Sequence, residues 1–398
     1  MIQLKENKNM KKLAIIGAGT RAEYIAIACR NLKVESHLFS LDNCDPKVFS
    51  LVDYFHNVDI FDIDKLVEIC TREKINGVCS TTEITIAVAA KLTSVLDLNG
   101  NPVEVAERIT NKFANRKLVA NVDGLKSPKF AEICTPEDVE HFKFTFPLIL
   151  KPEAFAGGKQ GVIVVRTRQE LISAFKFTSS NVKSRFNDKV LAEEFLVGGQ
   201  EYSVESLSFK KRHYIVQITQ KDSDNGLHCV ELGHHQPAEL SSEMSTKVRN
   251  VISDSLTAIG LENGPCHTEI KIIDGEIYLI EFNARPGGDH ISWPMVELST
   301  GYPYIEGVVQ IALDEFKPID VSSLKHRYSG LYYVAKQTSY LKPIFDVCEQ
   351  YSWCWKKHKV SDTLEELTHN DLEKMNYFIY SSDEGNPVAK LLKQKNKN

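Results

Sequence analysis

The stretch that decides the fold reads His267-Thr268-Glu269-Ile270-Lys271 and, a short turn later, Ile280-Glu281-Phe282-Asn283-Ala284-Arg285-Pro286-Gly287-Gly288. Side chains alternate along a β-strand, so Glu281 and Asn283 lie on one face of the second strand. Burying both at the end of an apolar strand is costly unless they bind a partner. Carboxylate and amide oxygens that project together suit Mg²⁺, with phosphate oxygens completing its octahedral shell. The strand pair is therefore a candidate magnesium site.

The length of the turn decides whether Glu269 joins this site. A two-residue turn at Asp274-Gly275 would send Glu269 and Glu281 to opposite faces, whereas a three-residue loop over Ile273–Gly275 restores a common face. We therefore predict the three-residue loop, with Glu269, Glu281 and Asn283 as metal ligands. The alternative is a surface hairpin whose charges form only ion pairs.

The residues after the second strand indicate an anion site. Arg285, beside two carboxylates and a metal, would offer a permanently charged fork to a transferring phosphoryl group or an acyl phosphate. Gly287 and Gly288 would let backbone N–H groups approach that anion closely. A tight turn without a ligand is the alternative explanation of the glycines.

A second anion-binding pattern lies upstream. The apolar strand Leu148–Lys151 ends in a lysine, and the loop 154–162 after it contains Gly157, Gly158, Lys159 and Gly161. Backbone donors and a lysine of such a loop can cover phosphates, although no Gly-Lys-Ser/Thr opens a helix here as a Walker A motif requires. In the following segment, Leu191–Ser203, backbone groups can contact an adenine and a carboxylate can hold a ribose. Glu194 and Glu201 fit that division.

The first hundred residues alternate apolar runs with helical patterns, which predicts βαβ units and a parallel sheet over 12–108. From Pro147 onward, strands joined by glycine-containing loops predict antiparallel α+β units. The turn Gly17-Ala18-Gly19-Thr20-Arg21-Ala22 fits a dinucleotide-binding fingerprint, with Asp42 placed to contact a ribose. A nicotinamide or flavin enzyme is therefore one alternative. Glycine at such a turn can also be required for close backbone packing alone, without any dinucleotide.

The composition is that of an ordinary globular protein. The chain has 398 residues, 42% of them hydrophobic and 25% charged, and a net charge of −5. This charge argues against a dedicated nucleic-acid binder, and no run approaches the roughly 18 apolar residues of a membrane span. Nine cysteines without a C-x-x-C pair indicate reduced thiols and a cytoplasmic protein. The apolar run after Lys12 meets Gly17 and Arg21 too early for a signal peptide, and the true start, Met1 or Met10, stays open.

Taken together, the order of these motifs resembles the ATP-grasp superfamily over about residues 12–310, and within it the L-amino acid ligases, or dipeptide synthases. The step of 12 residues from Glu269 to Glu281, with Asn283 and Arg285 following, carries most of this resemblance. It implies α/β and α+β architecture: an N-terminal parallel-sheet pre-ATP-grasp domain, a two-lobed ATP-grasp fold and a C-terminal extension. The expected divisions are 1–108 for the first domain, 109–145 for the helical part of the first lobe, 146–209 for the lid, 210–316 for the metal- and substrate-binding lobe, and 317–398 for the C-terminal subdomain.

The resemblance also implies roles for single residues. On the nucleotide side, Lys112 and Lys151 would bind phosphates, with the glycine loop as a mobile lid, and the adenosine contacts would be Glu194, Phe195, Val197 and Glu201. Two Mg²⁺ ions, with Mn²⁺ as a substitute, would bind the metal ligands named above. Arg285, Lys151 and Lys112 would be catalytic. The substrate side would comprise Glu231, His234, Arg285, Gly288, Asp289 and His290.

The expected function is an ATP-dependent carboxylate–amine ligase that forms an amide, by resemblance a dipeptide or amino-acid conjugate, through an acyl phosphate and releases ADP and phosphate. The expected partners are a small carboxylate, an amino acid by resemblance, and an amine. Homodimers are common in this family, and the oligomeric state of this chain stays open. The alternatives are a carboxyphosphate-forming ATP-grasp enzyme, an NAD(P)-binding oxidoreductase, and a nucleotide-binding protein without catalysis. The sequence identifies neither substrate.

Overall fold

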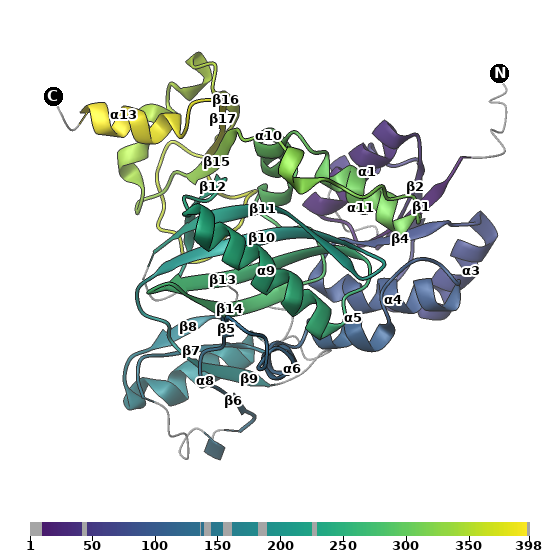
Figure 1. Cartoon of the computed structure of the whole chain (residues 1–398), viewed down its shortest axis with the longest axis horizontal. Helices are drawn as coiled ribbons and strands as arrows, with labels where there is room; N and C mark the ends of the chain where they lie inside the picture. The colour runs from purple at the N-terminus through teal and green to yellow at the C-terminus, as the bar shows by residue number, and fades with distance from the viewer. Residues whose placement is uncertain are drawn as a thin grey trace.

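The computed structural model describes residues 10–41, 46–135, 137–138, 145–153, 161–181, 189–224 and 229–395. These residues form three β-sheets with helices packed on them (Figure 1). One sheet is parallel and the other two are largely antiparallel, so the predicted combination of α/β and α+β units is confirmed.

The N-terminal sheet is parallel and has the strand order β3-β2-β1-β4. Its strands are β1 (Lys12–Ile16), β2 (Glu35–Ser40), β3 (Tyr54–Asn57) and β4 (Gly77–Ser80). The helices of this region are α1 (Thr20–Leu32), α2 (Pro46–Phe49), α3 (Ile63–Glu73), η1 (Glu83–Thr85), α4 (Ile86–Val95), α5 (Val103–Ile109) and α6 (Lys112–Leu118). Gly17, between β1 and α1, has φ 88°, and a Cβ there would lie 2.9 Å from Thr81 Oγ1. Close packing therefore explains this glycine without a dinucleotide.

The second sheet is antiparallel, in the order β6-β9-β7-β8, and forms the lower part of Figure 1. Its elements are β6 (Phe130–Ile133), β7 (Leu148–Pro152), β8 (Ile163–Val165), η3 (Arg168–Glu170), α8 (Leu171–Ser180) and β9 (Val190–Glu194). Apolar residues of α8 and the strands bury one another, among them Leu148, Leu150 and Leu171. The predicted loop residues Gly157, Gly158 and Lys159 lie outside the described residues.

The third sheet has nine strands in the order β16-β17-β15-β12-β11-β10-β13-β14-β5. Neighbours are antiparallel except β14 and β5. The strands are β5 (Leu125–Lys126), β10 (Gln200–Phe209), β11 (Arg212–Ser223), β12 (Glu231–Gln236), β13 (Gly264–Ile273), β14 (Glu276–Asn283), β15 (Tyr328–Tyr333), β16 (Cys354–His358) and β17 (Tyr377–Ser382). The strands after residue 316 thus extend the sheet that carries β13 and β14.

Helix α9 (Ser242–Ile259) lies across one face of this sheet (Figure 1). It begins at the capping residue Ser241, whose side chain accepts from Met244 N, and ends at the left-handed Gly260. The remaining helices are η4 (Ile291–Met295), α10 (Val296–Thr300), α11 (Tyr304–Ala312), η5 (Val321–Ser323), η6 (Ser339–Leu341), α12 (Lys342–Phe345), η7 (Cys348–Gln350) and α13 (Pro387–Lys395).

One hydrophobic core joins the N-terminal domain to the nine-stranded sheet. Ile25 of α1 belongs to the same buried cluster as Val309 of α11 and Leu207 of β10. This core packs α1 against α11 and α11 against β10, and so joins the two parts of the molecule.

No helix among the described residues combines the length and the apolar character that crossing a membrane requires.

Candidate active site

The hairpin of β13 and β14 has a two-residue turn, so the predicted three-residue loop is wrong. Ile273 pairs with Glu276, which leaves only Asp274 and Gly275 between the strands. Both turn residues have positive φ, 49° and 79°, as a type I′ turn requires. Asp-Gly accepts this conformation readily, and the turn therefore closes without a third residue.

A β-bulge restores the common face that the short turn alone would have removed. Ile270 pairs with Leu279, but Glu269 pairs with Glu281, so Ile280 is an extra residue in β14. The Ile280 carbonyl accepts a hydrogen bond of 2.9 Å from Nη2 of Arg116, a fully buried side chain. Glu269 and Glu281 therefore stand directly opposite each other, as the predicted metal site needs.

Each carboxylate of this pair already has a cationic partner. Glu281 Oε2 lies 3.0 Å from Lys112 Nζ, and Glu281 Oε1 accepts a 2.8 Å hydrogen bond from Asn283. Burial alone would raise the pKa of Glu281, but the Lys112 ammonium holds it well below its usual range. Glu269 Oε1 lies 2.9 Å from Lys221 Nζ. Clustered carboxylate and amide oxygens on adjacent strands are a donor set that fits Mg²⁺.

His267 supports Glu269 from the side. Its Nε2 lies 3.2 Å from Glu269 Oε1, and its Nδ1 forms a short contact with the buried carboxylate of Glu205. Burial lowers the pKa of His267, but the charge and hydrogen bond of Glu205, together with Glu269, raise it to about 9. This raised pKa favours the imidazolium form, and the contact with Glu269 helps to fix the orientation of that carboxylate.

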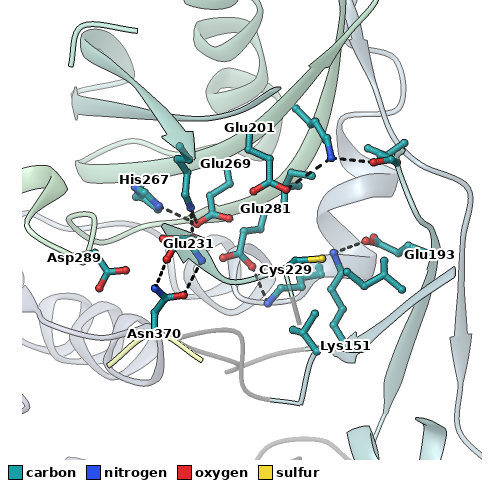
Figure 2. Close-up of a pocket in the computed structure, with 18 of the residues that line it drawn as sticks. Lys151, Glu193, Glu201, Cys229, Glu231, His267, Glu269, Glu281, Asp289 and Asn370 are labelled. Carbon is teal, nitrogen blue, oxygen red and sulfur yellow. Dashed lines mark hydrogen bonds and ion pairs between the residues drawn. The ribbon is translucent and has the colours of Figure 1, made fainter. Parts of the chain in front are cut away.

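The paired strands form one wall of a cavity of about 270 Å³. Its other walls come from the N-terminal domain, from β7 and β9 of the second sheet, and from the segment around Asn370. Figure 2 shows the carboxylates of Glu231, Glu269 and Glu281 pointing into the same space. Three parts of the chain that are distant in sequence thus meet around the predicted metal ligands.

The second predicted phosphate lysine, Lys151, also lines this cavity and contacts the Glu193 carboxylate (Figure 2). The same carboxylate contacts Arg116, so one buried anion holds both cations. Burial lowers the pKa of Lys151 to about 8 despite the charge of Glu193. A lysine in this state binds an anion best below that pH.

The predicted adenosine contacts are only partly brought together. Glu194, Phe195 and Glu201 line the cavity, and Glu201 Oε2 accepts a 3.1 Å hydrogen bond from Ser223. Val197 is 65% exposed and is not among the described residues that line the cavity, whereas Leu196 is. The neighbouring Leu196 lines the cavity, and the backbone contact of Val197 with adenine stays a prediction.

At the other end of the cavity lie the predicted substrate residues. Glu231 and Asp289 line it, and buried His234 lies 3.3 Å from Glu231 and 3.9 Å from Asp289. Each of these three residues offers one possible ligand atom, and the three atoms lie within 4.8 Å of one another. Neither ring nitrogen of His234 has a hydrogen-bond partner among the described residues. This acidic end suits a small cation such as a substrate ammonium group.

Two further predictions concern His290 and Gly287. His290 is buried, and its ring nitrogens each lie 2.9 Å from a tyrosine hydroxyl, of Tyr24 and of Tyr377. It is not among the described cavity residues, its bonds link α1 to β17, and its contact with a substrate stays a prediction. Gly287 donates its N–H to Glu205 and is therefore not available to an anion, whereas Gly288 and Arg285 line the cavity.

Several cavity residues escaped the sequence argument. Lys221 lies on β11 and contacts both Glu231, at 2.6 Å, and Glu269. Asn370 pairs with the Glu231 backbone through two hydrogen bonds of 3.0 Å. Arg21 belongs to the glycine-rich turn and also lines the cavity. The predicted strand ended at Thr219, two residues before Lys221, and nothing local marks Asn370 or Arg21 either.

Comparison with known proteins agrees with this geometry. Residues 144–293 match a family model described as the ATP-grasp domain. Alanine–anticapsin ligase of Bacillus subtilis is 27% identical over 255 residues, which cover 59% of this chain and 52% of the relative. The chain therefore spans about half the length of this curated relative.

Two solved structures share the fold over nearly the whole chain. The L-amino acid ligase from Bacillus licheniformis has a TM-score of 0.80 at 23% identity, with 97% of each chain covered. The biotin carboxylase domain of the Hydrogenobacter thermophilus 2-oxoglutarate carboxylase, a dimer in complex with MgADP and bicarbonate, has a TM-score of 0.72 at 14% identity, with 94% and 87% covered. The protein therefore carries an ATP-grasp domain, has the fold of that superfamily, and resembles the L-amino acid ligases within it.

Proposed function

We propose that the protein is an ATP-dependent carboxylate–amine ligase, which activates a carboxylate as an acyl phosphate, joins it to an amine and releases ADP and phosphate. One observation carries the proposal. The bulge at Ile280 sets Glu269 opposite Glu281 in a cavity that also holds Lys112, Lys151 and Arg285. Phosphoryl transfer is accelerated chiefly by positioned charges of this kind.

Glu269, Glu281 and Asn283 would hold magnesium, two ions by family resemblance, with manganese as a substitute. Bound MgATP supplies an electrophilic phosphorus whose negative charge is partly neutralised. Lys112 and Lys151 would orient the phosphates, and Glu201 the ribose. Glu194, Phe195 and Leu196 would contact the adenine. Gly157, Gly158, Lys159 and Gly161 remain proposed as a lid that excludes water from the activated acid.

The acidic end of the cavity supports an amino acid as the activated substrate. Glu231, His234 and Asp289 would hold the ammonium group of an amino acid whose carboxylate reaches Arg285 and Gly288. An amino-acid substrate gives these acids a role, because its ammonium group would pair with them, whereas bicarbonate has no cationic group for them to bind. This argues against a carboxyphosphate-forming enzyme. An oxidoreductase is disfavoured because a Cβ at Gly17 would lie 2.9 Å from Thr81 Oγ1, so backbone packing alone accounts for this glycine. The predicted ribose contact, Asp42, lies outside the described residues.

A homodimer also remains a proposal, supported by the dimer of the biotin carboxylase domain with the same fold.

A phosphate-release screen tests the function directly. Pairs of amino acids, organic acids and bicarbonate are incubated with MgATP, and the products are identified by mass spectrometry. We expect phosphate release only with an amino acid and an amine together, and a product joined by an amide bond. Release with bicarbonate alone, or MgATP binding with no turnover on any carboxylate, would overturn the proposal.

A further inference from the structure

We propose that Lys221 binds the carboxylate that is activated, and is thus a further substrate-binding residue of the catalytic site. This role rests on the proposed ligase function and adds a residue to which no step of that function has yet been given. In the scheme so far, only Arg285 and Gly288 receive this carboxylate.

Lys221 lies near the end of β11, in the wall of the main cavity. Its side chain is buried, and its Nζ lies 2.6 Å from Glu231 Oε1 and 2.9 Å from Glu269 Oε1. Glu231 is the proposed partner of the substrate ammonium group, and Glu269 is a proposed metal ligand. One buried cation therefore stands between the substrate end of the cavity and its metal end.

The Lys221 ammonium group has one more donor than its protein surroundings accept. An ammonium group carries three N–H donors. Among the described residues, its acceptors are the carboxylates of Glu231 and Glu269. A buried donor without an acceptor is costly. The third N–H is therefore suited to an acceptor that enters the cavity.

Charge favours an anion as this acceptor. Before any ligand binds, Lys221 offsets part of the charge of both carboxylates. An ammonium group at Glu231 and a metal at Glu269 would each compete with Lys221 for those oxygens. The cations would then repel one another unless an anion enters between them. The substrate carboxylate or a nucleotide phosphate can supply that negative charge.

The contact with Glu231 favours the substrate carboxylate over a phosphate. In an α-amino acid the ammonium and carboxylate groups are attached to the same carbon atom. An ammonium group held at Glu231 therefore brings the carboxylate within reach of the cation beside that residue. The proposed phosphate lysines pair with other acids, Lys112 with Glu281 and Lys151 with Glu193. The phosphates thus have cations of their own.

Two cations match the two oxygens of the carboxylate. One oxygen attacks the γ-phosphorus of ATP, and the new P–O bond forms as the bond from that phosphorus to ADP breaks. ADP keeps the electron pair of the broken bond. The other oxygen stays on the carbon as the carbonyl oxygen of the acyl phosphate. With Lys221 on one oxygen and Arg285 on the other, the carboxylate is oriented for attack, and neither residue exchanges a proton.

The acid and amide forms of one amino acid isolate this contact. Each standard L-amino acid that the wild type activates in the phosphate-release screen is compared with its own C-terminal amide, which keeps the ammonium group and lacks the carboxylate. Isothermal titration calorimetry in the presence of MgADP gives Kd for both without turnover. We expect the wild type to bind the acid more tightly, and Lys221→Met to reduce this preference roughly ten- to a hundredfold. Lys221→Arg, which keeps the charge, should retain more of the preference than Lys221→Met.

Lys271→Met is the matched control, because Lys271 is also buried and lines the same cavity, but its Nζ donates to Leu196 O at 2.9 Å. This variant should keep the wild-type preference. Equal binding of acid and amide by the wild type would overturn the role of Lys221. So would a Lys221→Met variant that weakens MgADP binding and leaves the preference unchanged, as loss of a phosphate contact would.

Folding of each variant is checked by urea denaturation. If Lys221→Met does not fold, Lys221→Gln takes its place, because glutamine retains N–H donors for the two carboxylates and lacks the charge. The same loss of preference is expected, and an unchanged preference would overturn the role. Absence of phosphate release by the wild type with every amino acid in the screen would instead overturn the ligase function itself.

Discussion

Replacing Glu281 by glutamine separates its charge from its shape. The variant keeps a side chain of the same size opposite Glu269 and removes the anion that Lys112 contacts at 3.0 Å. In the proposed site this anion is also a metal ligand. Glu281→Gln should therefore damage catalysis far more than folding.

The two effects can be scaled from the contacts. Breaking a buried ion pair costs roughly 3–5 kcal/mol when one charge is left without compensation. Lys112 keeps Glu83 at 3.8 Å, and the Glu281 side chain is 19% exposed to the cavity, so about 1–2 kcal/mol of lost folding stability is expected. Loss of one preorganised charge at a reacting phosphoryl group costs roughly 10²–10³ in kcat.

A coupled ADP-release assay and urea denaturation measure the two quantities. Glu276→Gln is the control, because Glu276 lies on the same strand and forms only an exposed ion pair of 3.4 Å with Lys126. It should behave as wild type in both assays. A Glu281→Gln enzyme within tenfold of the wild-type kcat, with an unchanged magnesium requirement, would refute the metal site.

Three further changes test the surroundings of this site. Because the pKa of Lys151 is about 8, KM for ATP should rise as the pH increases through that value. Lys151→Arg should abolish this rise, and Lys151→Ala should raise KM for ATP at every pH. A wild-type KM that does not change with pH would count against a phosphate-binding role of Lys151. Arg116→Leu should lower the free energy of unfolding by roughly 2–4 kcal/mol in urea titrations, because the buried Glu193 keeps only Lys151 and the Ile280 carbonyl loses its donor. A loss below about 1 kcal/mol would contradict the buried pairing. Asn370→Ala should lower the free energy of unfolding by about 1–2 kcal/mol and raise KM for the amino substrate, because Glu231 loses two backbone hydrogen bonds. An unchanged KM would show that Asn370 does not contribute to substrate binding.

The strands β13 and β14 were predictable because apolar and polar residues alternate strongly along them. The register in which these two strands pair was not predictable. β14 spans Glu276–Asn283, as the pattern indicates. The choice of a three-residue loop assumed that only the turn could restore the common face. A bulge does so equally well, and Ile280 carries no local sign of being an extra residue. Its stabilising partner, Arg116, is 164 residues away in sequence.

The same separation explains which site residues were found. Glu269, Glu281 and Arg285 stand in one motif whose spacing is informative by itself. Arg21 and Asn370 reach the cavity only because a shared core holds α1 against α11 and because β15 continues the sheet beyond β12. Contacts created by such packing leave no periodic trace in the sequence, so a sequence argument assigns Arg21 to its local turn.

The ion pairs of the cavity explain how so many charges persist in it. Lys112 is held by Glu281, Lys151 by Glu193, and Lys221 by carboxylates on either side. Unpaired charges in a protein interior are costly, and these pairings keep each group ionised before any ligand arrives. A phosphate that draws Lys112 away leaves Glu281 without its cation, and a cation that draws Glu281 away leaves Lys112 with only the more distant Glu83. Separating Lys112 from Glu281 is therefore favourable only if the phosphate and the cation bind together. We expect the nucleotide and its metal to bind as one unit.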